Sequence, residues 1–135
     1  MHDLLAETTD IIVNAANSQL GHGGGLARAI SVAGGPIVNS DSKEFISTYG
    51  EVRTGETCYT SSGKLKAKYL LHTVGPRWYD FSDADREDAR TLLRECATSI
   101  WTLSNRLGAG SISIPPISSG LFGYPKDLCA VDLIG

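Results

Sequence analysis

The hydrophobic positions of the chain form short apolar runs that alternate with longer stretches of helical spacing. The β-branched run Ile11 to Val13 has no polar alternation, which is typical of a strand buried on both faces. Residues 57–60, 69–74 and 111–114 predict three further strands. We expect the strands at 57–60 and 69–74 to pair or to lie side by side, because a turn-rich surface loop joins them.

Helical spacing is clearest between residues 85 and 106. Six apolar positions keep it there: Ala89, Leu92, Leu93, Cys96, Ile100 and Leu103. Acidic residues in the first turn and Arg106 in the last turn complement the helix dipole. A second stripe predicts a helix that ends at residues 34–36, a Gly-Gly-Pro stop. This stripe consists of Leu26, Ala29, Ile30 and Ala33.

Two shorter helices complete the pattern. Asp41 and Glu44 form a capping-box-like pair, which predicts a short helix that ends at Gly50. Apolar residues spaced by three predict another helix that begins at Pro125. Strands that alternate with helices indicate an α/β fold with a largely parallel sheet, and residues 1–135 suit a single domain.

Composition narrows the class of partner. The 135 residues carry 41% hydrophobic and 20% charged residues, as ordinary globular proteins do. A formal net charge of −3 with scattered basic residues argues against direct binding to a nucleic-acid backbone. A bound polyanion would therefore have to be met by backbone N–H groups and helix amino ends.

The sequence lacks the patterns of membrane spans, signal peptides, disulfide frameworks and metal sites. No apolar run approaches the roughly 18 residues of a membrane span, and no signal peptide is visible, so no membrane partner is expected. Cys58, Cys96 and Cys129 are odd in number and far apart, which indicates a reducing compartment, the cytoplasm or nucleus. The histidines and cysteines show no metal-ligand spacing, so neither a metal nor a cofactor is expected.

Glycines gather at two positions where a predicted strand is followed by a loop. Gly21 to Gly25 precede the helix of the Leu26 stripe, and Ser118 to Gly123 follow the strand at 111–114. Glycine leaves room for a phosphate beside exposed N–H groups, so two such loops at one sheet edge suit a diphosphate. The alternative is that each cluster only makes a turn. Neither loop has the dinucleotide-binding or P-loop pattern.

The sequence VNAANSQLGHGGGLA at residues 13–27 closely resembles the signature of macrodomains. HTVGP at 72–76 and the segment 114–123 resemble further parts of that family, in the same order. The motif sequence most resembles the macrodomains of antiviral mono-ADP-ribosyltransferases and those of the coronavirus type. The resemblance implies a three-layer α/β/α fold with a mostly parallel mixed sheet. Family members usually run longer, so we expect a chain truncated at both ends, a piece of a larger polypeptide.

The resemblance also implies a ligand, ADP-ribose, and the residues that contact it. Asp3 would accept a hydrogen bond from the adenine amino group, and Leu4 would lie beside the ring. Asn17 would bond the distal ribose, although an asparagine after a strand can instead bond its own turn. The two loops would enclose the pyrophosphate and the distal ribose. Their residues are Gly23, Gly24, Gly25, Leu26, Ser118, Ser119, Gly120, Leu121 and Phe122.

Some macrodomains only read ADP-ribosylation and others remove it. One hydrolase branch uses an aspartate where this chain has Ala27, so that mechanism is not expected. Asn17, His22 and Phe122 match the viral and antiviral branch and are the candidate catalytic residues. His22 could act as acid or base or could brace the loop, and Phe122 could only shape the pocket.

Three functions stay open at this point. The first is slow hydrolysis of ADP-ribose from Glu and Asp side chains of ADP-ribosylated proteins. The second is non-catalytic reading of such proteins, and the third is a scaffold that binds other partners. Two polar residues outside the loops have structural interpretations: Asn14 would hold the loop at the strand end, and His72 would be a hydrogen-bonded core histidine.

Overall fold

The computed structural model describes residues 10–21, 25–76 and 82–113. The elements, in chain order, are β1 (Ile11–Ala15), α1 (Gly25–Gly34), α2 (Pro36–Tyr49), β2 (Thr57–Thr60), β3 (Tyr69–Thr73), a 3-10 turn η3 (Asp83–Asp85), α3 (Arg86–Arg106) and β4 (Ile112–Ser113). These bounds confirm the predicted strands to within a residue or two, as far as the structure describes them. The helix predicted from Pro125 lies outside the described residues. In the described part of the chain, no helix has the length and apolar character that a bilayer span requires.

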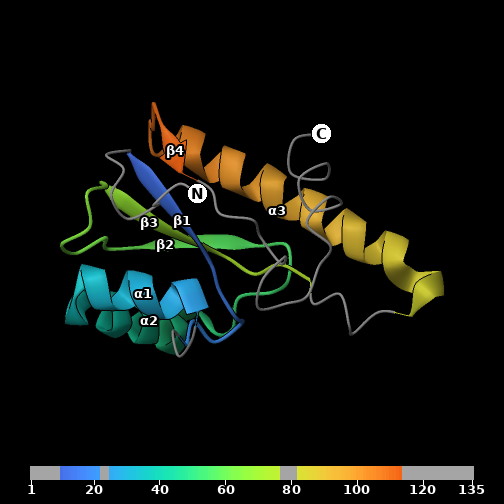
Figure 1. Cartoon of the computed structure of the whole chain (residues 1–135), viewed down its shortest axis with the longest axis horizontal. Coiled ribbons are helices and arrows are strands. Elements are labelled where there is room, and N and C mark those ends of the chain that lie inside the picture. The colour runs from blue at the N-terminus through green and yellow to red at the C-terminus, as the bar shows by residue number, and fades with distance from the viewer. Residues whose placement is uncertain (1–9, 22–24, 77–81, 114–135) are drawn as a thin grey trace.

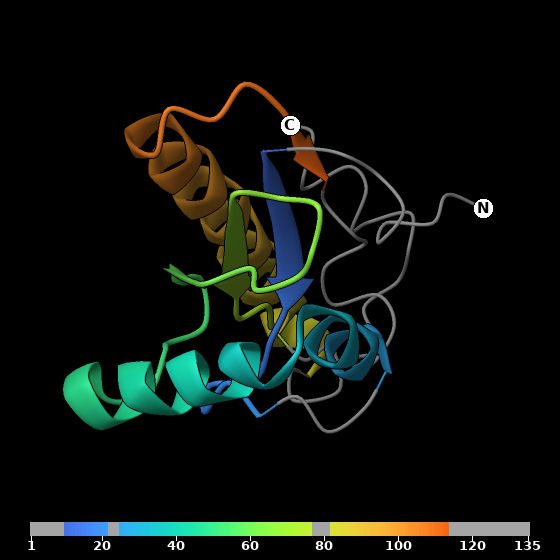
Figure 2. The same cartoon turned by 90° about the vertical axis from the view of Figure 1, so that its left-hand side faces the viewer.

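The four described strands form one mixed sheet in the order β2-β3-β1-β4. β1 pairs in parallel with β3 and β4, whereas β2 pairs antiparallel with β3. Helices α1 and α2 cover one face of the sheet and α3 covers the other (Figures 1 and 2). The structure therefore confirms the three-layer α/β/α fold, and it confirms that the strands at 57–60 and 69–74 pair.

The core lies on both faces of β1, because its side chains alternate between two helical layers. Ile11 and Val13 pack with α3, in a cluster that includes Leu93 and Ile100. Ile12 points the other way, into a cluster with Ile30 of α1. All three β1 residues are fully buried, as the unbroken apolar run predicts.

The buried face of α1 differs from the predicted stripe. Ile30 is buried as expected, but Ala29 and Ala33 are exposed. The buried positions are Ala27, Ile30, Ser31 and Gly34. Three of these four residues are small, so the helix can pack closely, and a Cβ on Gly34 would lie only 3.2 Å from the carbonyl oxygen of Ser62. A helix face built from small residues cannot be recognised from hydrophobic periodicity.

Helix α2 begins earlier than the capping-box pattern predicts. Pro36 occupies the first turn, where its missing N–H costs no helical hydrogen bond. Asp41 is therefore a mid-helix residue, and its carboxylate accepts a hydrogen bond from the Ser61 N–H, with 2.9 Å between the atoms. The helix ends at Gly50, as predicted, with a positive φ of 84°.

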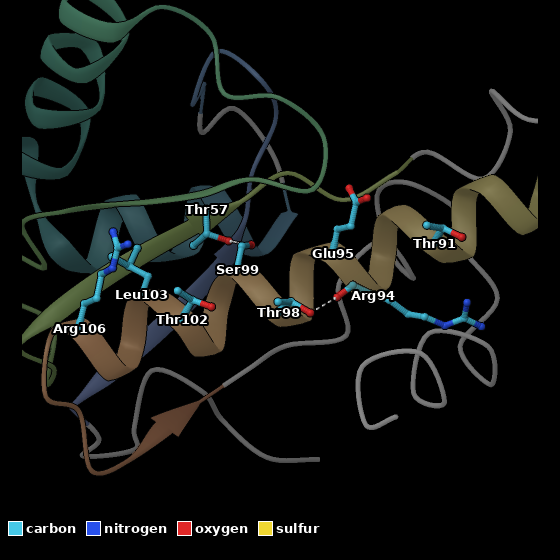
Figure 3. Close-up of a pocket in the computed structure, with 9 residues that line it drawn as sticks. All are labelled: Thr57, Thr91, Arg94, Glu95, Thr98, Ser99, Thr102, Leu103 and Arg106. Atoms are coloured by element: carbon cyan, nitrogen blue, oxygen red, sulfur yellow. Dashed lines mark hydrogen bonds between the residues drawn. The ribbon is translucent and has the colours of Figure 1, made fainter.

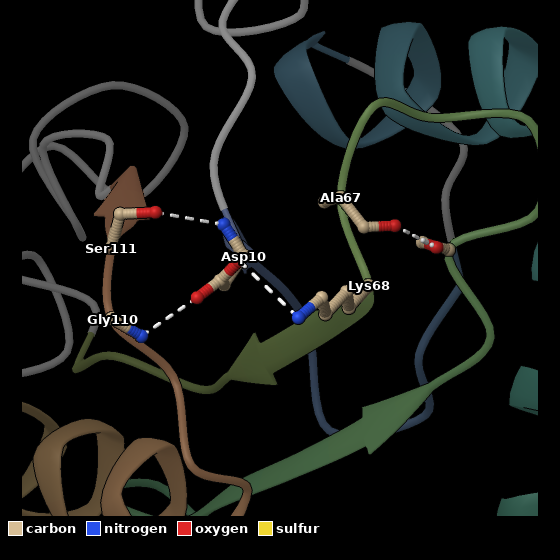
Figure 4. Close-up of polar contacts among 6 residues, drawn as sticks. Asp10, Ala67, Lys68, Gly110 and Ser111 are labelled. Carbon is tan, nitrogen blue, oxygen red and sulfur yellow. Dashed lines mark hydrogen bonds and ion pairs between the residues drawn. The ribbon is translucent and has the colours of Figure 1, made fainter.

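Asp10 ties together the amino ends of three strands (Figure 4). Its carboxylate accepts a hydrogen bond from the Gly110 N–H (2.7 Å), and its own N–H donates to Ser111 Oγ (2.9 Å). Its carbonyl oxygen accepts from the N–H groups of Lys68 and Tyr69. The residue thereby fixes the register of β1 against both β3 and β4.

Gly63 provides a test of the close packing between α1 and the loop before β3. Its φ is +57°, and an added Cβ would overlap the carbonyl oxygen of Gly34. We expect Gly63→Ala to lower the free energy of unfolding by more than about 3 kcal/mol, measured by urea denaturation. Gly108→Ala is the matched control, because φ is +71° there but the space is open. The control should lose only about 1 kcal/mol, and equal losses would contradict the packing argument.

Candidate functional site

The candidate site lies where the central strand β1 ends. The chain leaves β1 at Ala15, turns through Asn17 and reaches the amino end of α1 at Gly25. The Ala16 N–H donates to the carbonyl oxygen of Thr73, which holds the start of this loop against the end of β3. β1 and β3 run in parallel, so their carboxyl ends meet at one edge, where α/β folds bind their ligands.

The Asn17 side chain closes the loop on itself. Its Oδ1 accepts hydrogen bonds from the N–H groups of Gly21 (2.8 Å) and Gln19 (3.2 Å). Its Nδ2 donates to the carbonyl oxygen of Gly21 (3.0 Å). Asn17 thus bonds its own turn in the structure, and its contact with a ribose stays a prediction. The two are compatible, because Asn17 is exposed and these bonds use only one of its two amide hydrogens.

The buried side chain of Leu20 holds the same loop against the core. It has a positive φ of 53°, which is uncommon for a residue with a branched side chain. Its side chain is buried in a cluster with Ala16, Val52 and Val74. The Val52 N–H also donates to the carbonyl oxygen of Ser18 (2.9 Å). Packing and hydrogen bonds therefore hold the loop that carries Asn17.

A buried polar network supports the end of β1. Asn14 and His72 are register partners on β1 and β3, and Asn14 Nδ2 lies 3.1 Å from His72 Nδ1. His72 Nε2 lies 2.8 Å from Thr60 Oγ1, which donates to the carbonyl oxygen of Ser61. Because an amide nitrogen can only donate, Nδ1 accepts and Nε2 carries the proton. The prediction of a hydrogen-bonded core histidine is confirmed, and the network holds the strand end next to the loop.

The amino end of α1 bears no acidic side chain in its first turn. Gly25 opens this helix, and Leu26 follows it. Free N–H groups and the positive end of the helix dipole are therefore not opposed by a carboxylate from that turn. Ala27 stands where the resemblance to one hydrolase branch implies an aspartate, and its side chain is buried.

The described residues hold only part of the predicted site. Asn17, Gly25 and Leu26 belong to the same loop and helix start, as predicted. The remaining predicted residues lie outside the described part of the chain, and their roles stay predictions. They are Asp3, Leu4, His22, Gly23, Gly24, Ser118, Ser119, Gly120, Leu121 and Phe122.

The two described cysteines, Cys58 and Cys96, are buried free thiols. Burial, with a smaller effect of Glu56, raises the pKa of the Cys58 thiol to about 12. Burial likewise raises the pKa of Cys96 to about 11, and its thiol lies 3.3 Å from the carbonyl oxygen of Val74. Both stay protonated at neutral pH. The described residues also contain no group of three or more His, Cys, Asp or Glu that could hold a metal ion.

Sequence reasoning missed a groove of about 550 Å³ along α3 (Figure 3). Hydroxyl-bearing residues line much of it, and Thr57 Oγ1 lies 2.6 Å from Ser99 Oγ across it. Thr91, Thr98 and Thr102 keep helical spacing on the side of α3 away from its apolar stripe, which was the available signal. Gly21 and Gly25, the glycine-loop ends that the structure describes, do not line this groove.

Comparison with known sequences assigns the chain to a family. A Macro domain profile matches residues 13–132. An uncharacterized protein of Sulfurisphaera tokodaii is 44% identical over 133 residues, which cover 98% of this chain and 69% of that protein. The O-acetyl-ADP-ribose deacetylase 1 of Pantoea vagans is 38% identical over 128 residues, which cover 95% of this chain and 72% of the enzyme.

Solved structures agree with the sequence comparison. The Oceanobacillus iheyensis macrodomain with ADP superposes with a TM-score of 0.89 and 36% identity, covering 98% of this chain and 70% of that one. The Trypanosoma brucei macrodomain in complex with ADP-ribose gives a TM-score of 0.79 and 34% identity, covering 95% and 50%. From the profile match over most of its length and from these relatives, the chain belongs to the Macro domain family.

Proposed function

We propose that this chain binds ADP-ribose, free and attached to proteins, at the loop between β1 and α1. The observation that carries the proposal is the Asn17 loop, which its own side chain closes beside the amino end of α1. Solved relatives with 34% and 36% identity hold ADP-ribose or ADP. The glycines from Gly21 to Gly25 offer backbone N–H groups without Cβ atoms, which suits a diphosphate. Because the chain has a net charge of −3, backbone donors suit this ligand better than scattered basic side chains do.

We further propose slow hydrolysis of ADP-ribose from acidic side chains. The Pantoea vagans relatives are named O-acetyl-ADP-ribose deacetylases, so they cleave an ester between a carboxylic acid and ADP-ribose. ADP-ribose linked to a glutamate is also a carboxylic ester, so the same bond type would be broken. Asn17 would position the distal ribose, and His22 and Phe122 would complete the site, as in the viral and antiviral branch. The support for that branch is the motif spacing, since the relatives in the sequence comparison above are archaeal and bacterial.

A non-catalytic reader is the second candidate. It is favoured by the chemistry of the described part of the site, where Asn17 and Ala27 offer no acid or base. Asn17 also uses both lone-pair positions of Oδ1 within its own loop. A reader would bind ADP-ribose equally well but would not turn it over, so binding and turnover have to be measured separately.

Calorimetric titration tests the binding proposal. We expect ADP-ribose to bind with a micromolar Kd, about −7 to −8 kcal/mol. AMP lacks the second phosphate and the distal ribose, so it should bind at least about tenfold more weakly. Equal affinities for the two nucleotides would contradict the claim that the glycine loops hold the diphosphate. Absence of binding to either would leave the scaffold hypothesis.

A further inference from the structure

The outer edge of β2 has backbone groups available for another strand. β2 ends the sheet order, and no strand in the described part of the chain pairs with its outer side. The Tyr69 N–H donates to Asp10, and the Thr73 carbonyl accepts from Ala16, so odd-numbered residues of β3 turn their backbone groups toward β1. The even-numbered residues between them therefore turn theirs toward β2.

Register then decides which groups of β2 face outward. Cys58 and Thr60 are the partners of His72 and Leu70, so their N–H and C=O groups point inward to β3. The Val74 N–H donates to the carbonyl oxygen of Glu56. This bond also joins two even-numbered residues, so it agrees with the same alternation. Thr57 and Tyr59 consequently direct two N–H donors and two C=O acceptors outward, as strand addition requires.

A groove of about 830 Å³ runs along this edge. One wall belongs to α2, where the rings of Phe45 and Tyr49 are tilted against each other with 4.9 Å between their centroids. The other wall includes Tyr59 and Tyr69, whose rings meet edge to face at 5.7 Å, and Leu103 of α3. Tyr49 is 74% and Tyr59 47% exposed, so both walls offer aromatic surface to an occupant.

The two walls differ in charge. Asp41 and Glu44 lie one turn apart on α2 and line the groove beside Phe45 and Tyr49. Carboxylates next to aromatic faces favour Lys or Arg side chains, through ion pairs and cation–π contacts. The opposite wall includes Tyr59, Tyr69 and Leu103, which favour apolar side chains. Lys68 also lines the groove, but its ammonium group lies 3.9 Å from the Asp10 carboxylate, which offsets its charge. Because side chains alternate along a strand, an occupant with basic residues at every second position and apolar residues between them fits both walls.

A second copy of this chain fits less well. Pairing of two β2 edges about a twofold axis would place α2 of both copies on the same face of the joined sheet. Asp41 and Glu44 of each copy would then face the same carboxylates of the other, and each chain already carries a net charge of −3. We propose that the β2 edge binds an extended segment of a partner protein in which basic and apolar residues alternate.

A synthetic peptide tests this proposal. The probe is an acetylated, fluorescein-labelled heptapeptide in which four lysines alternate with three valines, followed by fluorescence anisotropy. We expect saturable binding that Glu44→Lys weakens about tenfold or more. Asp88→Lys is the matched control, because it makes the same charge change on exposed α3 surface outside the groove. A peptide with glutamate in place of lysine should not bind.

Amide exchange identifies the backbone contact. In the complex, the Tyr59 N–H should gain protection, whereas the Cys58 N–H, already paired with β3, should not change. Absence of peptide binding up to about 1 mM would overturn the proposal. Equal weakening by Glu44→Lys and Asp88→Lys would overturn it too, because the attraction would then be non-specific. Protection of Tyr59 that rises with protein concentration alone would assign the edge to a second copy instead.

Discussion

Gly24→Glu is expected to abolish detectable binding of ADP-ribose, a loss of more than about 100-fold. Gly24 belongs to the glycine run that leads into the amino end of α1. A side chain there would fill the space needed by a phosphate and would add a like charge beside it. The measurement is calorimetric titration of a variant whose circular dichroism and thermal transition match those of the unmodified chain.

A matched variant separates this local effect from the change in net charge. Ser47→Glu adds the same charge on an exposed position of α2 outside both grooves, and it should leave the affinity unchanged. If folded Gly24→Glu protein bound ADP-ribose normally, the phosphates would have to bind elsewhere on the molecule.

Asn17→Ala should lower the rate of ADP-ribose release by about 100-fold. The asparagine would position the distal ribose, and it also fixes Gly21 through bonds to both its N–H and its carbonyl oxygen. Asn17→Asp keeps an oxygen that can accept from Gly21 and Gln19 but loses the donor, so an intermediate rate is expected. His22→Ala should lower the rate of ADP-ribose release less than Asn17→Ala does, if His22 only braces the loop.

The assay is single-turnover loss of label from a Glu-linked mono-ADP-ribosylated protein at matched ligand occupancy. Matched occupancy is needed because Asn17→Ala also removes the bonds that shape the loop. A rate unchanged by Asn17→Ala would refute the assignment of that residue. No release above the uncatalysed rate by the unmodified chain would leave the reader as the supported function.

Local sequence signals predicted most of the described elements. The run Ile11 to Val13 could be assigned to a strand buried on both faces because nothing polar interrupts it. Gly50 ends α2 with a positive φ, a conformation that favours glycine, so the stop was visible in the sequence. α3 carries enough apolar positions to show its period over 21 residues.

Errors arose where tertiary contacts override local patterns. Asp41 and Glu44 have the spacing of a capping box, but Pro36 starts the helix a turn and a half earlier, and Asp41 bonds the Ser61 N–H instead. The face of α1 is set by the space beside Gly34, which no hydrophobic period reports. Such contacts join residues far apart in the sequence, so a single sequence does not contain them in readable form.

The candidate site was predicted in outline from its motif. The sequence placed Asn17 and Gly25 between a strand and a helix, and the structure confirms that placement. It left open whether Asn17 bonds its own turn, and the structure shows that it does. The contact between Asn14 and His72 joins residues 58 positions apart, and its geometry follows from strand register. The outward backbone groups of β2 were likewise invisible before the register was known.

The position of β1 between β3 and β4 has a consequence for synthesis on the ribosome. Of the described strands, β1 is made first, yet Asn14 meets its partner 58 residues later, and Asp10 meets Ser111 only 101 residues later. At a translation rate of roughly 5–20 residues per second, the wait for β4 is on the order of 5 to 20 s. Until β3 follows, both edges of the apolar strand Ile11 to Val13 lack their partners, and until β4 follows, one edge still does. Early shielding by chaperones would therefore raise the yield of folded protein.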